Sequence, residues 1–281
     1  MADPATAGEG ASGLRSNLFQ RVIAALVLAP LGIAAAWYGG WFWVGLVTIT
    51  IVGLLGEWQM IVGNLRPMAL MWGYLALGTA GICLGIEKFD LANLCVALGL
   101  FAMFLFSAPA QRSWSAIGLA YTAAAMFACV LVRRDPSHGF LALIFVFLVV
   151  WITDILGYFV GRGLGGPKLW VRVSPKKTWS GAIGGVFGCM AFAAAFAGAG
   201  YGKLAPMLLL ATVISIISQL GDLFESAVKR QFGVKDSSQI IPGHGGLLDR
   251  LDGFMAAIIA AAVIGYMRSG TESIGQGLLV W

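Results

Sequence analysis

Apolar residues gather in long runs along the chain, and short polar or glycine-bearing segments separate one run from the next. Nine of these runs approach the ~20 residues that a helix needs to cross the ~30 Å hydrocarbon core of a bilayer. The break between the first two runs depends on Gly39 and Gly40 alone. The pattern predicts an all-α fold, a polytopic bundle of about nine transmembrane helices. The predicted helices cover residues 22–38, 42–62, 67–86, 91–109, 114–132, 139–161, 181–199, 204–226 and 253–267.

The composition supports this class and excludes others. Hydrophobic residues make up 59% of the chain and charged residues 11%, whereas soluble domains have about 45–50% and about 25%. So few charges cannot cover a soluble surface, which excludes a soluble enzyme, a disordered protein and a fibrous repeat. An outer-membrane barrel would instead show alternating segments of about ten residues.

Three parts follow one another along the chain. Residues 1–14 are rich in Ala, Gly and Ser without periodicity, so we expect a disordered tail. Residues 15–134 form a transmembrane scaffold, and residues 135–281 form the transmembrane domain that carries the candidate chemistry. Within the scaffold, residues 22–38 have the length and flanking arginines of a secretory signal, but a second apolar run follows at once, which favours a retained helix.

The placement of lysine and arginine predicts a cytoplasmic N-terminus. With that orientation, 13 of the 18 basic residues lie on the cytoplasmic side, as positively charged loops do in membrane proteins. The pair Arg133 and Arg134 is the main exception. Because loop placement accounts for the net charge of +5, we expect no nucleic-acid partner. Two connections, 162–180 and 227–252, are much longer than the others and face the cytoplasm, so we expect the protein to act there.

Several acids lie within or at the edge of apolar runs, where a carboxylate is costly and usually faces a bundle interior or a watery cavity. Glu57 sits near the end of its run and either reaches the membrane interface or has a function. Asp154 lies deeper, which favours a function. Asp222 and Glu225 are one helical turn apart on one face, and a structural salt bridge with Lys229 or Arg230 is the alternative to a functional role.

Two basic segments could bind phosphate. The first contains Ser174, Lys176 and Lys177 shortly before a helix that we expect to start at about residue 180, and helix N-termini and lysines both favour anions. An ordinary positive loop is the alternative there. The second segment runs from Ser226 to Asp252 and combines carboxylates, bases and glycines, as polyphosphate chemistry requires. Its polar residues are Lys229, Arg230, Lys235, His244, Asp249, Arg250 and Asp252.

A hard cation fits the second segment. Mg²⁺ takes oxygen ligands and usually uses one or two carboxylates together with substrate phosphates. His244 either contacts phosphate or packs within the glycine-rich turn.

The stretch from Ser226 to Asp252 resembles, without a gap or mismatch, the signature of phosphatidate cytidylyltransferases, also called CDP-diglyceride synthases. It reads SAVKRQFGVKDSSQIIPGHGGLLDRLD. The segment Ser174–Trp179 is similar to a second cytoplasmic motif of that family. Many members have Glu where this chain has Ser180, so no acidic role carries over to that position. The first 130 residues resemble the family in their hydrophobic pattern alone.

The resemblance implies an activity and a location. Family members are polytopic helical proteins of the inner cell membrane, often homodimers, with a metal-dependent site on the cytoplasmic side. They transfer CMP from CTP to phosphatidic acid and release pyrophosphate. A CTP-dependent lipid kinase and a membrane transporter are the rival hypotheses. The kinase would transfer the γ-phosphoryl group instead, and the transporter would pair its acids at the membrane midplane.

The resemblance and the residue types together suggest roles for individual side chains. We expect Asp222 and Asp249 to bind Mg²⁺, with Asp154 and Asp252 as further candidates and a second cation left open. Basic and hydroxyl residues would bind the substrates. Lys229, Arg230 and Lys235 are expected on the triphosphate, Ser174, Lys176 and Lys177 on a substrate phosphate, and Ser226, His244 and Arg250 as further substrate-binding residues.

Overall fold

The computed structural model describes residues 30–238 and 245–281 and confirms an all-α polytopic membrane protein. Eight helices in this part of the chain are long and apolar enough to cross a membrane. Of the first predicted helix, residues 30–38 are helical and residues 22–29 lie outside the described part, as does the predicted tail. The spanning helices are α2 (Gly40–Val62), α3 (Pro67–Gly85), α4 (Phe89–Phe106), α5 (Arg112–Arg134), α6 (Gly139–Leu164), α7 (Trp179–Gly198), α8 (Leu204–Gln231) and α9 (Leu248–Ser269).

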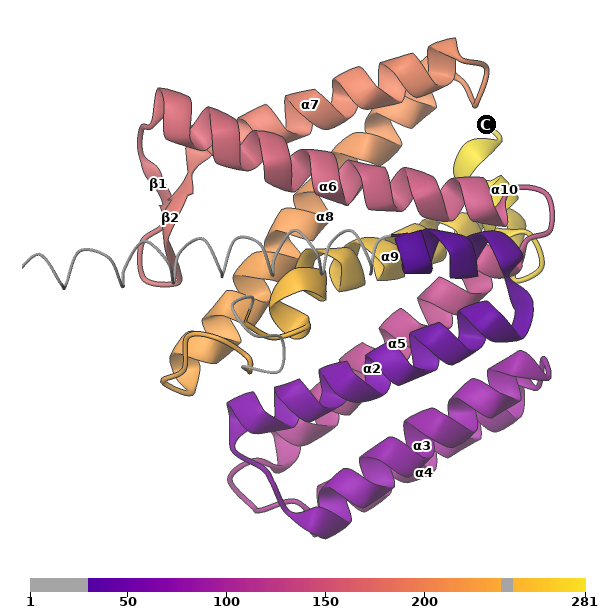
Figure 1. The fold of residues 1–281 in the computed structure, drawn as a ribbon, viewed down its shortest axis with the longest axis vertical. Coiled ribbons are helices and arrows are strands. Elements are labelled where there is room, and N and C mark those ends of the chain that lie inside the picture. The colour runs from indigo at the N-terminus through magenta and orange to yellow at the C-terminus, as the bar shows by residue number, and fades with distance from the viewer. Residues whose placement is uncertain (1–29, 239–244) are drawn as a thin grey trace, which may run out of the picture.

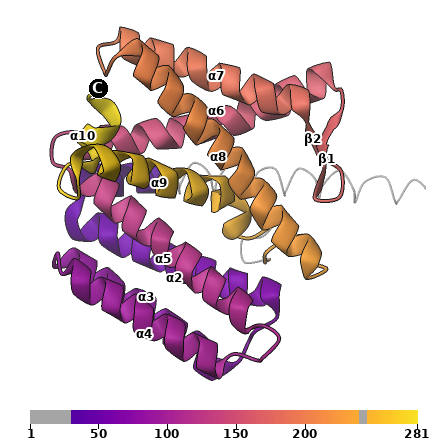
Figure 2. The same cartoon turned by 180° about the vertical axis from the view of Figure 1, so that it is seen from behind.

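The helix α9 runs through the middle of the bundle. In Figures 1 and 2, α3 and α4 lie together at one edge, α6 and α7 lie together at the opposite edge, and α9 passes between these pairs. It contacts both α5, from the N-terminal part of the chain, and α8, from the C-terminal part. The helix α9 is therefore held from both sides.

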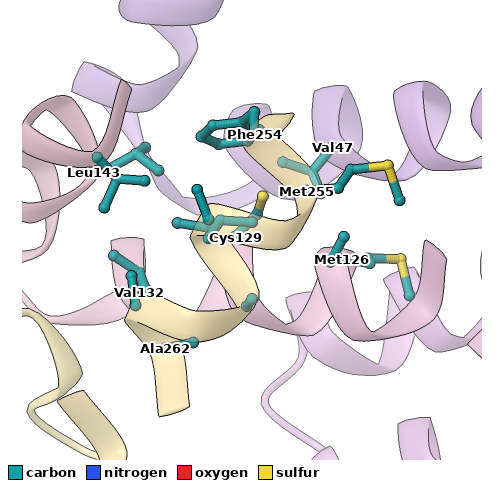
Figure 3. Packing of buried hydrophobic residues seen from close by; sticks show 14 of the residues in the cluster. Val47, Met126, Cys129, Val132, Leu143, Phe254, Met255 and Ala262 are labelled. Carbon is teal, nitrogen blue, oxygen red and sulfur yellow. The ribbon is translucent and has the colours of Figure 1, made fainter. Parts of the chain in front are cut away.

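Buried apolar side chains of α9 pack together with those of three other helices (Figure 3). Met126 and Leu143 are completely buried, and Met255 of α9 is 1% exposed. Because lipid is as apolar as these side chains, close van der Waals packing is what holds the helices together in a bilayer. The labelled residues come from α2, α5, α6 and α9: Val47, Met126, Cys129, Val132, Leu143, Phe254, Met255 and Ala262.

Glycines bring α8 and α9 into backbone contact. A Cβ atom added at Gly221 would lie 2.9 Å from the carbonyl oxygen of Asp252, and one added at Gly253 would lie 2.8 Å from Ser218 Oγ. Small residues allow such close approach between membrane helices. Since Asp222 follows Gly221 and Asp252 precedes Gly253, the crossing places two predicted site residues at one point of the bundle.

A small hairpin that the sequence analysis did not predict joins α6 to α7. Its strands are β1 (Lys168–Trp170) and β2 (Ser174–Thr178), which pair antiparallel with Lys168 opposite Thr178. The predicted helix start near residue 180 is confirmed, because α7 begins at Trp179 and Thr178 Oγ1 accepts a hydrogen bond from the N–H of Gly181. A three-residue strand is too short to produce a recognisable alternation.

The predicted loop bounds were wrong at three helix ends, because the charged turns are helical. The helix α6 extends to Leu164, α8 to Gln231, and α9 begins at Leu248. A prediction from hydropathy places the end of a helix before its first charged turn. Basic residues in a last turn and acidic residues in a first turn nevertheless interact favourably with the helix dipole, so such turns can be helical. A short C-terminal helix, α10 (Ile274–Leu279), was also not predicted.

Arg133 and Arg134, the exceptions to the predicted cytoplasmic placement of basic residues, have partners close by at the C-terminal end of α5. Arg133 Nη2 donates to the carbonyl oxygen of Trp37 at 2.9 Å. Arg134 forms ion pairs with Glu87 at 3.0 Å and Glu272 at 3.5 Å. These arginines thus bind the end of the helical segment 30–38 and two acidic side chains.

Candidate active site

Five carboxylates gather around the crossing of α8 and α9. Asp222 and Glu225 come from α8, Asp249 and Asp252 from α9, and Asp154 from α6. Asp252 lies within electrostatic reach of Asp222 and Glu225, and Asp154 lies within reach of Asp222. The structure thus brings together all four acids that the sequence analysis predicted as metal ligands, and it adds Glu225.

Lys229 lies between two of these acids. Its Nζ atom is 2.5 Å from Glu225 Oε2, one helical turn away, and 2.6 Å from Asp249 Oδ1 on α9. The Lys229 side chain is 9% exposed, that of Glu225 1% and that of Asp249 14%. The predicted alternative of a salt bridge between Glu225 and Lys229 is therefore confirmed, and the bridge also includes Asp249.

Lys177 reaches the same cluster from the hairpin. Its Nζ atom lies 2.5 Å from Asp222 Oδ2, and both side chains are 29% exposed. Ser226 Oγ donates to the other oxygen of Asp222 at 3.4 Å. Asp222 thus pairs with Lys177 of β2 and not with Lys229 or Arg230, and the two basic segments singled out in the sequence meet at α8.

Asp249 is also held by backbone groups. Its Oδ2 atom accepts hydrogen bonds from the N–H of Gly246 at 2.9 Å and from the N–H of Ser237 at 3.1 Å. Together with the Lys229 contact, these bonds fix the orientation of the carboxylate before any substrate arrives. Hydrogen bonds to an ionised group are about twice as strong as neutral ones.

Glu57 contributes a contact that sequence reasoning missed. Its side chain is completely buried, so it binds groups of the protein and not solvent. Both oxygens accept hydrogen bonds from the segments that flank Asp249, namely from the hydroxyls of Ser237 and Ser238 and from the N–H groups of Leu247 and Leu248. The position of Glu57 within an apolar run was the signal in the sequence, but the sequence does not show which groups it binds.

The remaining predicted residues lie around this cluster. Arg230, Lys176, Lys235 and Arg250 are exposed at the same end of the bundle. Arg230 Nη1 donates to the carbonyl oxygen of Val234 at 3.2 Å. Ser174 begins β2 and is half-buried. His244 lies outside the described residues.

The donor chemistry fits a hard cation. Two lysines, Lys177 and Lys229, lie against five carboxylates, so the cluster offers more carboxylate oxygens than these two amines can pair with. Among the described residues, no three His, Cys, Asp or Glu side chains are placed to hold a metal ion by themselves. Mg²⁺ commonly takes one or two carboxylates and completes its shell with substrate phosphates, so Asp222 and Asp249 would serve with a phosphorylated substrate present.

These features define a polytopic membrane enzyme whose site sets lysines beside carboxylates at one end of the bundle, as phosphate-transfer chemistry requires. The chain belongs to the cytidylyltransferase family, whose model matches residues 19–267. It is 41% identical over 250 residues to a phosphatidate cytidylyltransferase of Brucella abortus biovar 1 (strain 9-941), covering 86% of this chain and 91% of that protein. It is 30% identical over 251 residues to the phosphatidate cytidylyltransferase of Bacillus subtilis (strain 168), covering 75% and 92% respectively.

Proposed function

We propose that this enzyme transfers CMP from CTP to phosphatidic acid, giving CDP-diacylglycerol and pyrophosphate for phospholipid synthesis. The observation that carries the proposal is the meeting of Lys177, Asp222, Lys229 and Asp249 at the α8–α9 crossing, at the end of the bundle where the basic segments lie. The proposal requires that a nucleotide from solution and a lipid phosphate from the leaflet both reach this position. The family and the relatives support the same substrates.

The proposed reaction is a direct in-line displacement. A phosphate oxygen of phosphatidic acid forms a bond to the α-phosphorus of CTP, and the bond from that phosphorus to the bridging oxygen of the β-phosphate breaks. Pyrophosphate leaves with the electron pair. The attacking phosphate is already anionic, so the protein needs no nucleophilic side chain and mainly has to hold two polyanions together.

The lysines and the acids would divide this work. Lys229, Arg230 and Lys235 would bind the triphosphate, while Lys176, Lys177 and Ser174 would bind a substrate phosphate, with Ser226 and Arg250 nearby. Asp222 and Asp249 would hold Mg²⁺, with Asp154 and Asp252 as further oxygen donors. When bound, Mg²⁺ supplies positive charge that stabilises the phosphate groups during transfer. The homodimer and the second cation remain predictions.

Product identity tests the function. A cytidylyltransferase forms a CDP-lipid and pyrophosphate, whereas a lipid kinase would form a phosphorylated lipid and CDP. The kinase has no observation in its favour, and the transporter rival does not agree with the family of the chain.

We expect the double variant Lys176→Gln with Lys177→Gln to raise the KM for CTP or for phosphatidic acid by at least about tenfold, or ~1.4 kcal/mol, the loss of one charge-assisted contact. Steady-state kinetics on the purified variant measure this. Lys168→Gln, in the exposed partner strand β1, is the matched control and should leave KM unchanged. If KM and kcat were both unchanged in the double variant, these lysines would not bind a substrate phosphate.

We further propose that the site faces the cytoplasm across the inner cell membrane, where CTP is available. In a variant without its native cysteines, Arg172→Cys at the exposed hairpin turn should resist an impermeant maleimide in spheroplasts and react after lysis. Lys203→Cys, exposed at the other end of α7, should react without lysis. Labelling of Arg172→Cys in intact spheroplasts would overturn the orientation.

A further inference from the structure

The start of α9 lacks a capping side chain of its own. Its N-cap residue is Leu247, which makes no side-chain cap hydrogen bond. The first N–H groups of a helix have no partner within the helix and need an acceptor when they are buried. Leu248, the first helical residue, is completely buried, so water cannot take this role.

Glu57 supplies the missing acceptors from α2. Its Oε1 atom lies 2.8 Å from the Leu247 nitrogen, and its Oε2 atom lies 2.6 Å from the Leu248 nitrogen. A carboxylate at this end of a helix also interacts favourably with the helix dipole. Glu57 therefore caps α9 from a helix that lies far away in the sequence.

The same carboxylate holds the segment on the other side of Asp249. Ser237 Oγ donates to Glu57 Oε2 at 2.9 Å, and the N–H of Ser237 donates to Asp249. A Cβ atom added at Gly246 would lie 2.5 Å from Glu57 Oε2 and 1.8 Å from Ser237 Oγ. Ser237 and Gly246 thus lie between two carboxylates, that of Glu57 on one side and that of Asp249 on the other.

We propose that Glu57 is a positioning residue for Asp249, holding in place the backbone groups that orient this carboxylate and the turn of α9 that carries it. The inference rests on the role of Asp249 in the proposed function. It also means that α2, in the N-terminal part of the chain, supports the site through Glu57 in addition to packing against other helices.

The test replaces Glu57 with Gln, which keeps the size of the side chain but removes the charge and turns one acceptor oxygen into a donor. The matched control is Asp135→Asn. Asp135 is 3% exposed and accepts hydrogen bonds from the N–H groups of Ser137, His138 and Gln276 at the opposite end of the bundle. It is an equally buried carboxylate bound to backbone groups, but it lies away from the site.

We expect Glu57→Gln to lower kcat by about 10- to 100-fold and to raise the Mg²⁺ concentration for half-maximal activity by a similar factor, the usual effect of losing a residue that orients a ligand. Asp135→Asn should change neither. A mere loss of folded enzyme would lower the rate without moving the Mg²⁺ dependence. Amide hydrogen exchange should accelerate at residues 246–250 in Glu57→Gln and not in Asp135→Asn.

If Glu57→Gln does not fold, Ser237→Ala with Ser238→Ala removes two of the four hydrogen bonds that Glu57 accepts from described residues and keeps the carboxylate. This variant should show smaller changes of the same kind in kcat, in the Mg²⁺ dependence and in hydrogen exchange. Unaltered exchange at residues 246–250 together with an unaltered Mg²⁺ dependence in either folded variant would overturn the inference. If wild-type enzyme makes no CDP-lipid, the proposed function fails instead, while hydrogen exchange still reports on Glu57.

Discussion

Replacing either Asp222 or Asp249 with Asn should lower kcat by about two to four orders of magnitude, because each change removes a charge that a hard cation at the transferring phosphate requires. Stability should change little. The Asp222–Lys177 pair is partly exposed, and such pairs contribute about 0–1 kcal/mol. In Asp249→Asn, Lys229 keeps Glu225 as its partner. Single-turnover kinetics and thermal unfolding in detergent measure both quantities.

The opposite pattern would identify these acids as structural. In that case the melting temperature would fall by several degrees, and the remaining folded enzyme would keep substantial activity. That result at both positions would remove the metal-ligand assignment. Asp135→Asn again serves as the control for replacing a buried acid outside the site.

Lys229→Gln should destabilise the protein by about 3–5 kcal/mol, the cost of leaving buried charge without its partner. Lys229 is the shared cation of Glu225, which is 1% exposed, and of Asp249. Activity should be lost as well, because the same amine is expected to bind the triphosphate. Denaturant unfolding in detergent and the rate of CDP-lipid formation measure the two effects.

A second substitution separates the two roles of Lys229. Adding Glu225→Gln removes the unpaired buried acid, so the double variant should recover most of the lost stability and none of the lost activity. If the double variant regained activity along with stability, Lys229 would be a structural residue. If Lys229→Gln were as stable as wild type, the buried ion pair would not carry the expected energy.

The membrane class and most helices could be predicted because hydropathy alone determines them. The break after the first predicted helix could be predicted for a different reason, namely its two glycines. Gly39 and Gly40 have φ angles of 68° and 53°, which glycine adopts without strain. The helix ends were less predictable. The turns that contain Lys229 and Asp249 are polar, and their helical state depends on contacts between α8 and α9.

The site could be predicted as a set of residue types but not as a set of contacts. The motif from Ser226 to Asp252 indicated Lys229 and Asp249, and the position of an acid at the end of an apolar run indicated Asp222. The pairing of Lys177 with Asp222 depends on a hairpin that shows no alternation in the sequence. Glu57 reaches Ser237 across 180 residues, and no local pattern reveals such a contact.

The most direct test of the account uses the purified full-length enzyme in detergent with phosphatidic acid, Mg²⁺ and CTP labelled at either the α- or the γ-phosphate. We predict that the α-label appears in CDP-diacylglycerol and that the γ-label appears in pyrophosphate. The Asp249→Asn variant should produce neither at a comparable rate. Transfer of the γ-label to lipid, with the α-label remaining in CDP, would contradict the proposed function.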